Sequence, residues 1–143
     1  TLFLHGGIAP EAVQMALAPE STNTAYRASL GKPKAEVKAD PATAPLYDGK
    51  TSPIWYRGYF DGRLDADGVQ QVLDQLDLRR IVVGHTSMPH VSQFHDGRVI
   101  AIDSSIKDGQ SGELLFIEND QLSRGLLDGS RVPLAEGTLD ADD

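Results

Sequence analysis

The sequence predicts an α/β domain in which a mixed β-sheet carries flanking helices, and three observations support this fold class. Short apolar runs that stop close to glycines, of which residues 1–4 and 81–83 are the clearest, are typical of strands inside a sheet. Residues 65–78 place apolar side chains at helical spacing, which predicts a helix lying on a sheet face. The two runs that flank Asn119 and Asp120 indicate an antiparallel hairpin, so the sheet is predicted to be mixed.

Two shorter helices are predicted near the start of the chain. Residues 10–17 and 21–30 have a mildly helical pattern. Ser21 or Thr22 is expected to cap the second of these helices, and Gly31 is expected to end it.

The middle of the chain alternates between loop and regular structure. Asp65 or Asp67 is expected to cap the helix predicted at 65–78, and the apolar run 99–103 predicts another strand. An exposed loop insertion is predicted at about 31–53, because four prolines deny it a long regular element: Pro33, Pro41, Pro45 and Pro53.

One domain accounts for 143 residues of which 40% are hydrophobic. We assign residues 1–133 to the C-terminal portion of that domain and residues 134–143 to a solvated acidic tail. Because the chain opens directly on an apolar run at Thr1, we expect it to be the C-terminal part of a longer protein. A sheet cut at this point is expected to associate with itself or with the missing part.

Composition excludes several classes of function. A formal charge of -8 is unfavourable for binding nucleic acid or an anionic membrane surface. The absence of cysteine excludes disulfides, zinc–thiolate sites and cysteine nucleophiles within this chain. No apolar run approaches the roughly 20 residues that span a bilayer, so we expect a soluble protein, either cytoplasmic or periplasmic.

Three polar residues are candidates for chemistry. His5 precedes two glycines at one predicted strand end, His85 follows Gly84 at another, and Arg57 lies in an aromatic segment. Strand ends at one edge of an α/β sheet border a ligand crevice, so the two histidines are placed to converge, and imidazole is a common metal ligand. Either histidine taken alone is more often a surface or hydrogen-bonded residue.

Together, three segments resemble the second half of the calcineurin-like metallophosphoesterases. The segments are Leu2-Phe3-Leu4-His5-Gly6-Gly7-Ile8, Pro53-Ile54-Trp55-Tyr56-Arg57 and Val82-Val83-Gly84-His85-Thr86. The match is closest to the bacterial Shewanella-like branch of the phosphoprotein phosphatases and runs from about residue 1 to 118. Two mild departures are Ser52 and Ser105, which stand where the family has glycine.

The resemblance implies a role for each candidate residue. His5 and His85 would bind one metal of a two-metal centre, and Arg57 would hold the phosphate. Ser87 occupies the position of a further metal-binding histidine found in other branches, which favours the protein-phosphatase branch. Asp103 has two readings of equal weight: it orients a ligand histidine, or it caps the turn after its strand.

The resemblance also implies the reaction and its partners. It implies the C-terminal half of a calcineurin-like α/β sandwich that hydrolyses a phosphomonoester, on a phosphorylated protein or a small molecule, with two divalent ions of manganese, iron or zinc. The motifs GDxHG, GDxxDRG and GNHE of the family's N-terminal half do not occur, so this chain carries at most one partial metal site and is expected to be inactive alone. The alternatives are a non-catalytic binding or interaction module with a phosphatase-like half-fold, and a structural domain whose histidines are incidental.

Overall fold

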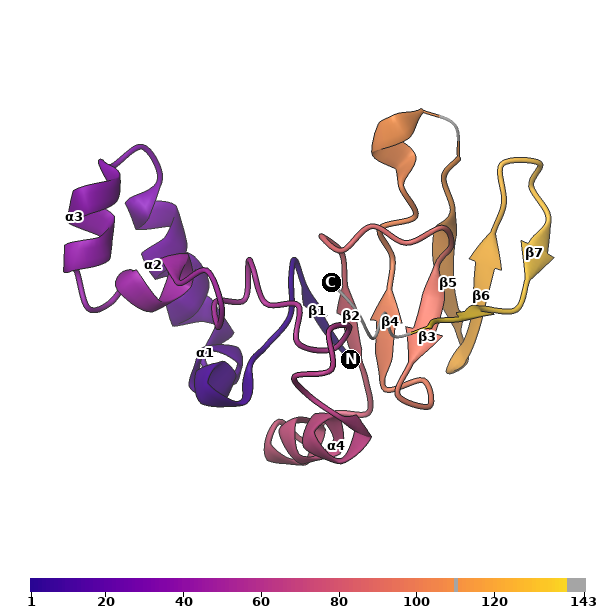
Figure 1. The fold of residues 1–143 in the computed structure, drawn as a ribbon, viewed down its shortest axis with the longest axis horizontal. Coiled ribbons are helices and arrows are strands. Elements are labelled where there is room, and N and C mark those ends of the chain that lie inside the picture. Colours follow the sequence, from indigo (N-terminus) through magenta and orange to yellow (C-terminus); the bar gives the residue numbers. More distant parts are fainter. Residues whose placement is uncertain (110, 139–143) are drawn as a thin grey trace.

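The computed structural model describes residues 1–109 and 111–138. At its centre lies a five-stranded sheet in the order β1 (Leu2–Leu4), β2 (Ile81–Val83), β4 (Val99–Ala101), β3 (Ser92–Phe94) and β8 (Ala135–Glu136) (Figure 1). Strand β2 is parallel to both β1 and β4, whereas β3 and β4 are antiparallel. The predicted mixed sheet is therefore confirmed, but its antiparallel pair is β3–β4 and not the predicted hairpin, which belongs to a separate sheet. Strands β3 and β8 were not predicted.

A second, three-stranded sheet contains β5 (Leu114–Glu118), β6 (Gln121–Gly125) and β7 (Arg131–Val132). The predicted hairpin is β5–β6. Asn119 and Asp120 both have positive φ, 49° and 64°, as a two-residue hairpin turn with left-handed central residues requires.

The helices comprise η1 (Pro10–Ala12), α1 (Val13–Leu17), α2 (Pro19–Ser29), α3 (Lys34–Ala39), η2 (Ala44–Tyr47), α4 (Ala66–Gln75) and η3 (Ile106–Asp108). Asp65 caps α4 as predicted, because its side chain accepts a 2.8 Å hydrogen bond from the Gly68 amide. The predicted cap of α2 is wrong. This helix starts at Pro19, whose missing N–H suits the first turn, and Thr22 donates instead to the Met15 carbonyl at 2.9 Å.

The predicted loop insertion at 31–53 contains two short helices, α3 and η2. Pro33 occupies the N-cap of α3, and Pro45 lies in the first turn of η2. At these positions a proline initiates a helix, since it replaces an amide that has no intrahelical partner. Val37 and Leu46 bury the inner faces of the two helices.

Both faces of the five-stranded sheet are covered around β2. Ile81 and Val83 pack into a cluster with Val69 and Leu73 of α4, whereas Val82 packs in a second cluster toward Leu115 and Leu122 of the small sheet. Helices α1–α3 lie at one end of the molecule and β5–β7 at the other (Figure 1). The strand ends of β1 and β2 lie between them.

The beginning of the predicted acidic tail 134–143 is part of the fold. Residues 135–136 form β8, and the amide of Gly137 donates to the Gln93 carbonyl at 2.9 Å. Asp140, Asp142 and Asp143 lie outside the described residues. Among the described residues, no helix is long and apolar enough to cross a membrane.

Candidate functional site

The two candidate histidines lie side by side at one edge of the sheet. Strands β1 and β2 are parallel with Leu4 opposite Val83, so the chain leaves both strands at the same edge. The ring centroids of His5 and His85 are 4.7 Å apart, and the Gly84 amide donates to the His5 carbonyl at 2.9 Å. The geometric convergence that the sequence predicted is thus present; the role of the two rings as metal ligands stays a prediction.

His85 has an unusual backbone conformation and an unpartnered ring nitrogen. Its backbone is left-handed, with φ of 67°, and its Nε2 atom is buried without a hydrogen-bond partner in the described structure. Burial lowers the pKa of this imidazole, the positive charges of Arg57 and His5 lower it further, and Asp103 opposes the shift. The neutral form is favoured, and a neutral imidazole offers the lone pair that metal binding requires.

The aromatic segment is fastened to the loop that follows β1. The Pro53 carbonyl accepts hydrogen bonds from the amides of Gly6 and Gly7, at 2.8 and 3.2 Å. A Cβ atom at Gly6 would lie 2.5 Å from the Ile54 carbonyl oxygen, so the close approach of these two segments requires glycine there. The contact brings the Trp55 ring to 5.2 Å from that of His85, edge-on at 75°.

The neighbouring aromatic side chains serve the core. Tyr56, Tyr59 and Phe60 are buried, and the Tyr59 hydroxyl both donates to the Ile8 carbonyl and accepts from the Ile8 amide, each at 2.9 Å. Burial raises the pKa of Tyr56 to about 12 and raises that of Tyr59 further. Both phenols remain neutral near pH 7 and supply packing rather than proton transfer.

Arg57 is exposed beside the histidine pair, and its charge contributes to the lowered pKa of His85. Within residues 1–109 and 111–138, no carboxylate forms an ion pair with it. Its guanidinium therefore remains available to an anionic ligand.

Asp103 acts on the backbone after its strand. Its carboxylate accepts hydrogen bonds from the Ser87 hydroxyl at 3.0 Å and from the Ser105 amide at 3.1 Å. These bonds agree with the turn-capping reading, and the bond to Ser87 also ties the loop after His85 to the end of β4. Among the described residues no hydrogen bond joins Asp103 to a histidine ring, and its role in orienting a ligand histidine stays a prediction.

Glu113 is a residue of the site's support that the sequence analysis missed. Its side chain is 8% exposed, accepts from the Val91 amide at 2.8 Å, and contacts His90 Nδ1 at 2.8 Å and Arg124 Nη1 at 2.6 Å. These bonds connect the loop after β2 to the small sheet. No local sequence pattern predicts that Glu113 bonds to Val91, His90 and Arg124, because these partners lie far from Glu113 along the chain.

The structure brings two candidate metal donors together. The unpartnered Nε2 of His85 and the adjacent His5 ring fit one divalent ion, because imidazole nitrogens bind zinc, iron and similar metals. In the described part of the chain, no group of three or more His, Asp or Glu side chains could hold a metal. Binding of one metal by this partial set stays a prediction.

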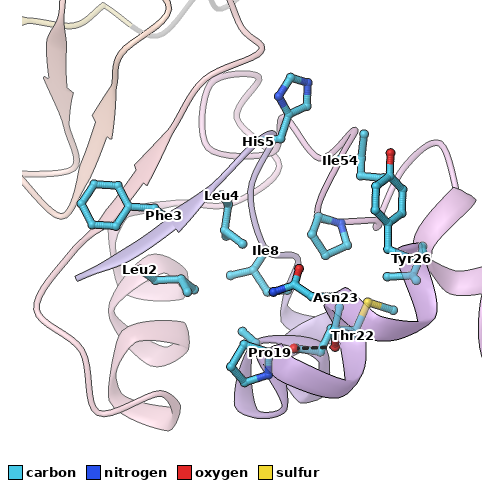
Figure 2. A pocket seen from close by; sticks show the side chains of 14 residues that line it. Leu2, Phe3, Leu4, His5, Ile8, Pro19, Thr22, Asn23, Tyr26 and Ile54 are labelled. Atoms are coloured by element: carbon cyan, nitrogen blue, oxygen red, sulfur yellow. Dashed lines mark hydrogen bonds between the residues drawn. The ribbon is translucent and has the colours of Figure 1, made fainter. Parts of the chain in front are cut away.

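A cavity of about 250 Å³ adjoins the site beside β1. Figure 2 shows His5 at the end of this strand, at the rim of the cavity, while Leu4, Ile8 and Ile54 contribute apolar walls. Asn23 and Thr22 of α2 are among its few polar side chains. The cavity is an apolar hollow along the edge strand, and it meets the polar site only through His5.

Comparison with solved structures places this geometry among phosphatases. The chain is 41% identical to the cold-active protein-tyrosine phosphatase of the psychrophile Shewanella sp., with a TM-score of 0.80. This chain is a relative of a phosphatase. The match covers 92% of the chain and 40% of that enzyme, and a second structure of a cold-active protein tyrosine phosphatase gives the same identity and TM-score over 96% of the chain.

The chain thus spans about 40% of the length of the phosphatases that it matches. No protein-family model matches it, and no curated protein does. The expected phosphatase relationship is confirmed, and the observed α/β fold with a mixed sheet and flanking helices agrees with it.

Proposed function

We propose that this chain is the C-terminal part of a metal-dependent phosphatase of the calcineurin-like metallophosphoesterase type, acting on phosphomonoesters and above all on phosphoproteins. The observation that carries the proposal is the histidine pair, 4.7 Å apart at the ends of two parallel strands, in a chain 41% identical to a phosphatase. A cysteine nucleophile cannot come from this chain, which has no cysteine, so water is the nucleophile we propose.

His5 and His85 would hold one of two divalent ions, of manganese, iron or zinc, and the metal would activate water and polarise the phosphate. The remaining ligands would come from the N-terminal half of the same domain. The calcineurin-like sandwich would be completed by that half along the free edge of β1.

The chain's own residues would bind and orient the substrate. Arg57 would hold phosphate oxygens through its forked N–H donors, a geometry that lysine lacks. The bond between Ser87 and Asp103 would keep the loop after His85 in place, because it ties that loop to β4. The environment that lowers the pKa of His85 would keep its ring neutral and ready to bind.

The test uses the polypeptide extended at its N-terminus to the length of the matched phosphatases, with p-nitrophenyl phosphate as substrate. We expect turnover that a chelator abolishes and that manganese, iron or zinc restores. His85→Ala should reduce turnover by more than about a hundredfold, since even residues that only support metal ligands are worth about 10- to 100-fold. Glu118→Gln is the control, because this glutamate pairs with Arg131 at the exposed surface of the small sheet.

The isolated 143-residue chain should show no appreciable turnover, with or without manganese. Robust turnover that disappears in His85→Ala would mean that this chain alone builds a complete site, and the half-site proposal would be wrong. An extended protein that binds phosphopeptides without metal and never hydrolyses them would support the interaction-module alternative.

A further inference from the structure

The Tyr59 hydroxyl makes two hydrogen bonds that core packing alone does not require. It donates to the Ile8 carbonyl and accepts from the Ile8 amide, each at 2.9 Å, so one side chain satisfies both backbone groups of one residue. Tyr59 and Ile8 are both 0% exposed, so these groups have no access to water. A phenylalanine would fill the same space without the hydroxyl. The hydroxyl therefore has a role besides packing, which is to hold the backbone at Ile8.

Ile8 follows His5 on the chain that leaves β1 (Figure 2). The residues between them are held in the same way, since the amides of Gly6 and Gly7 donate to the Pro53 carbonyl. Every backbone amide from residue 6 to residue 8 is thus bonded to the aromatic segment that begins at Pro53. The loop that starts at His5 takes its position from this segment.

Tyr59 is itself held in place from several sides. Its ring lies edge-on to those of Tyr56 and Phe60, with centroids 5.2 and 6.1 Å away. His95 Nε2, in the turn between β3 and β4, donates to the Tyr59 carbonyl at 2.7 Å. A Cβ atom at Gly7 would lie 2.7 Å from Cε2 of Tyr59, so the ring lies directly against the loop. Burial raises the pKa of the phenol, which keeps the proton that it donates.

His5 is fixed on both sides of its position in the chain. Its carbonyl accepts from the Gly84 amide at 2.9 Å, which ties it to the end of β2, and the loop after it is bonded to the aromatic segment. Its ring centroid lies 4.7 Å from that of His85. Because a metal ligand must stay within about 0.5 Å of its productive position, a shift of the backbone at Ile8 would matter for any ion held by this pair.

We infer that Tyr59 is a positioning residue for the proposed metal site: its hydroxyl, bonded to both backbone groups of Ile8, holds the loop that begins at His5 so that the His5 ring meets that of His85. The inference rests on the proposed function and deepens it. Tyr59 touches neither metal nor substrate and acts through His5.

The test uses the protein extended at its N-terminus, freed of metal by a chelator and titrated with nickel by calorimetry, at a temperature where thermal unfolding shows each variant to be folded. Tyr59→Phe keeps the ring and removes the hydroxyl. It should raise the Kd of the nickel ion whose binding His5→Ala weakens by about tenfold, the lower end of the range for residues that support metal ligands. The manganese concentration for half-maximal turnover of p-nitrophenyl phosphate should rise by a similar factor.

Tyr47→Phe is the matched control. It removes the same atom, in this case a hydroxyl bonded to that of Ser29 at 2.7 Å, between η2 and α2. The nickel Kd and the manganese requirement should both stay unchanged.

A double-mutant cycle with His5→Ala shows whether Tyr59 acts through His5. In the His5→Ala background, Tyr59→Phe should change the nickel Kd by less than about twofold, because the residue that it positions is gone. A general loosening of the fold would instead weaken binding equally in both backgrounds.

His95→Asn provides a second, milder variant should Tyr59→Phe fail to fold. Asparagine tolerates the left-handed backbone of His95, with φ of 52°, but its side chain is too short to reach the Tyr59 carbonyl. The nickel Kd should rise about threefold, as expected for one lost hydrogen bond, and again only when His5 is present.

An unchanged nickel Kd in Tyr59→Phe, or an equal loss with and without His5, would overturn the inference and leave the proposed phosphatase function standing. If Tyr59→Phe does not fold, the same two results in His95→Asn decide. Absence of turnover in the unsubstituted extended protein would overturn the proposed function, and the nickel cycle would still decide the role of Tyr59. Absence of both turnover and nickel binding would overturn both.

Discussion

At the scale of single residues, the site is built from groups that the fold leaves without internal partners. His85 Nε2 is buried and unbonded, Arg57 lacks an ion pair among the described residues, and Trp55 keeps nearly half its surface exposed. A folded domain ordinarily satisfies its buried polar atoms and covers its large aromatic rings. His85 Nε2 and Trp55 depart from this rule, and in the proposed function a bound metal and the N-terminal half of the domain would complete their surroundings.

Metal binding by the histidine pair can be followed through Trp55. Adding nickel or cobalt to the 143-residue chain should quench its emission, because ions with open d shells accept excitation energy over short distances and Trp55 lies 5.2 Å from His85. His5→Ala should weaken the apparent affinity by more than about tenfold, since half of the donors disappear. Zinc, with a filled d shell, should compete without quenching in the same way. Equal quenching in His5→Ala and the unsubstituted chain would place the metal elsewhere.

Arg57 should matter for substrate and not for folding. In the extended protein, we expect Arg57→Ala to raise KM for p-nitrophenyl phosphate by at least about tenfold, because a charge-assisted pair with phosphate contributes about 1.5 to 3 kcal/mol. The free energy of unfolding should change by less than about 0.5 kcal/mol, as is usual at an exposed position. Arg57→Lys should recover only part of the binding. Unchanged kinetics in Arg57→Ala would remove this residue from the site.

The residues that the sequence identified were those next to local signals. His5 and His85 stand beside glycines at the ends of apolar runs, which is a pattern visible along the chain. The exposure of Trp55 was not visible in this way, since the sequence presents it as one of four aromatic residues within residues 55–60. Only the contact between residues 6–7 and 53, far apart in the chain, determines which ring faces the site.

At the scale of elements, the loop after β2 depends on two clamps. The Ser87–Asp103 bond fixes its beginning to β4, and Glu113 fixes its end to the small sheet through the Val91 amide and Arg124. Glu113 is nearly buried, so its charge is stabilised by these donors and not by water. Through these bonds, the position of the β5–β6 hairpin constrains the loop that follows His85.

The Glu113 clamp should make stability depend on acid pH. Burial acts to raise the pKa of Glu113, but hydrogen bonds from the Val91 amide and His90 and the charge of Arg124 outweigh it, so the pKa lies below the ordinary value of 4.5. A carboxylate with a lowered pKa in the folded state stabilises the fold above pH 4.5, and the contribution is lost as pH falls through the folded-state pKa.

Glu113→Gln should therefore reduce the free energy of unfolding at pH 7 by about 1.5 to 3 kcal/mol and flatten its decline below pH 4.5. Urea unfolding across this pH range measures both effects. Glu118→Gln is the matched control, since that glutamate pairs with Arg131 at the exposed surface. A decline of the same steepness in Glu113→Gln would assign the acid sensitivity to other carboxylates.

Prediction of elements succeeded where burial and local chemistry agree. Strand β2 and helix α4 have apolar patterns that can be recognised from a short stretch of sequence, and α4 also has a capping residue at its start. Strand β3 did not, because Ser92–Phe94 becomes a strand only by pairing with β4 and β8. Helices α3 and η2 were not predicted, because their prolines were interpreted as helix breakers. In the structure these prolines lie at helix starts.

At the scale of the whole molecule, β1 is the last strand of the five-stranded sheet, and no described strand pairs with its outer side. Phe3 is 63% exposed on this strand, and the apolar cavity of about 250 Å³ lies beside it. A free strand edge next to apolar surface is a ready template for another strand. In the matched phosphatases, which are more than twice as long, further chain is available to cover it.

The isolated chain should therefore associate. Sedimentation of the 143-residue chain should show a mass that rises with concentration, and Phe3→Lys should shift this rise to higher concentration by at least about tenfold, because charged residues protect strand edges. Ile106→Lys, at an apolar residue 68% exposed on η3, is the matched control. A monomer that persists at high concentration, or an equal effect of both substitutions, would show that the β1 edge is not the contact.

Because β1 and β2 are parallel, a ligand bound at the candidate site would also hold the two strands together. β1 has three residues and pairs with one strand among those the structure describes, so its detachment should require little free energy compared with other local openings of the fold. A ligand held jointly by His5 and His85 would bridge the two strand ends and close the long loop between them, and it would be released whenever β1 swings away. Docking of the strand and occupancy of the site are then two measures of one equilibrium. Slow hydrogen exchange at Leu2–Leu4 would signal a filled site, without any assay of catalysis.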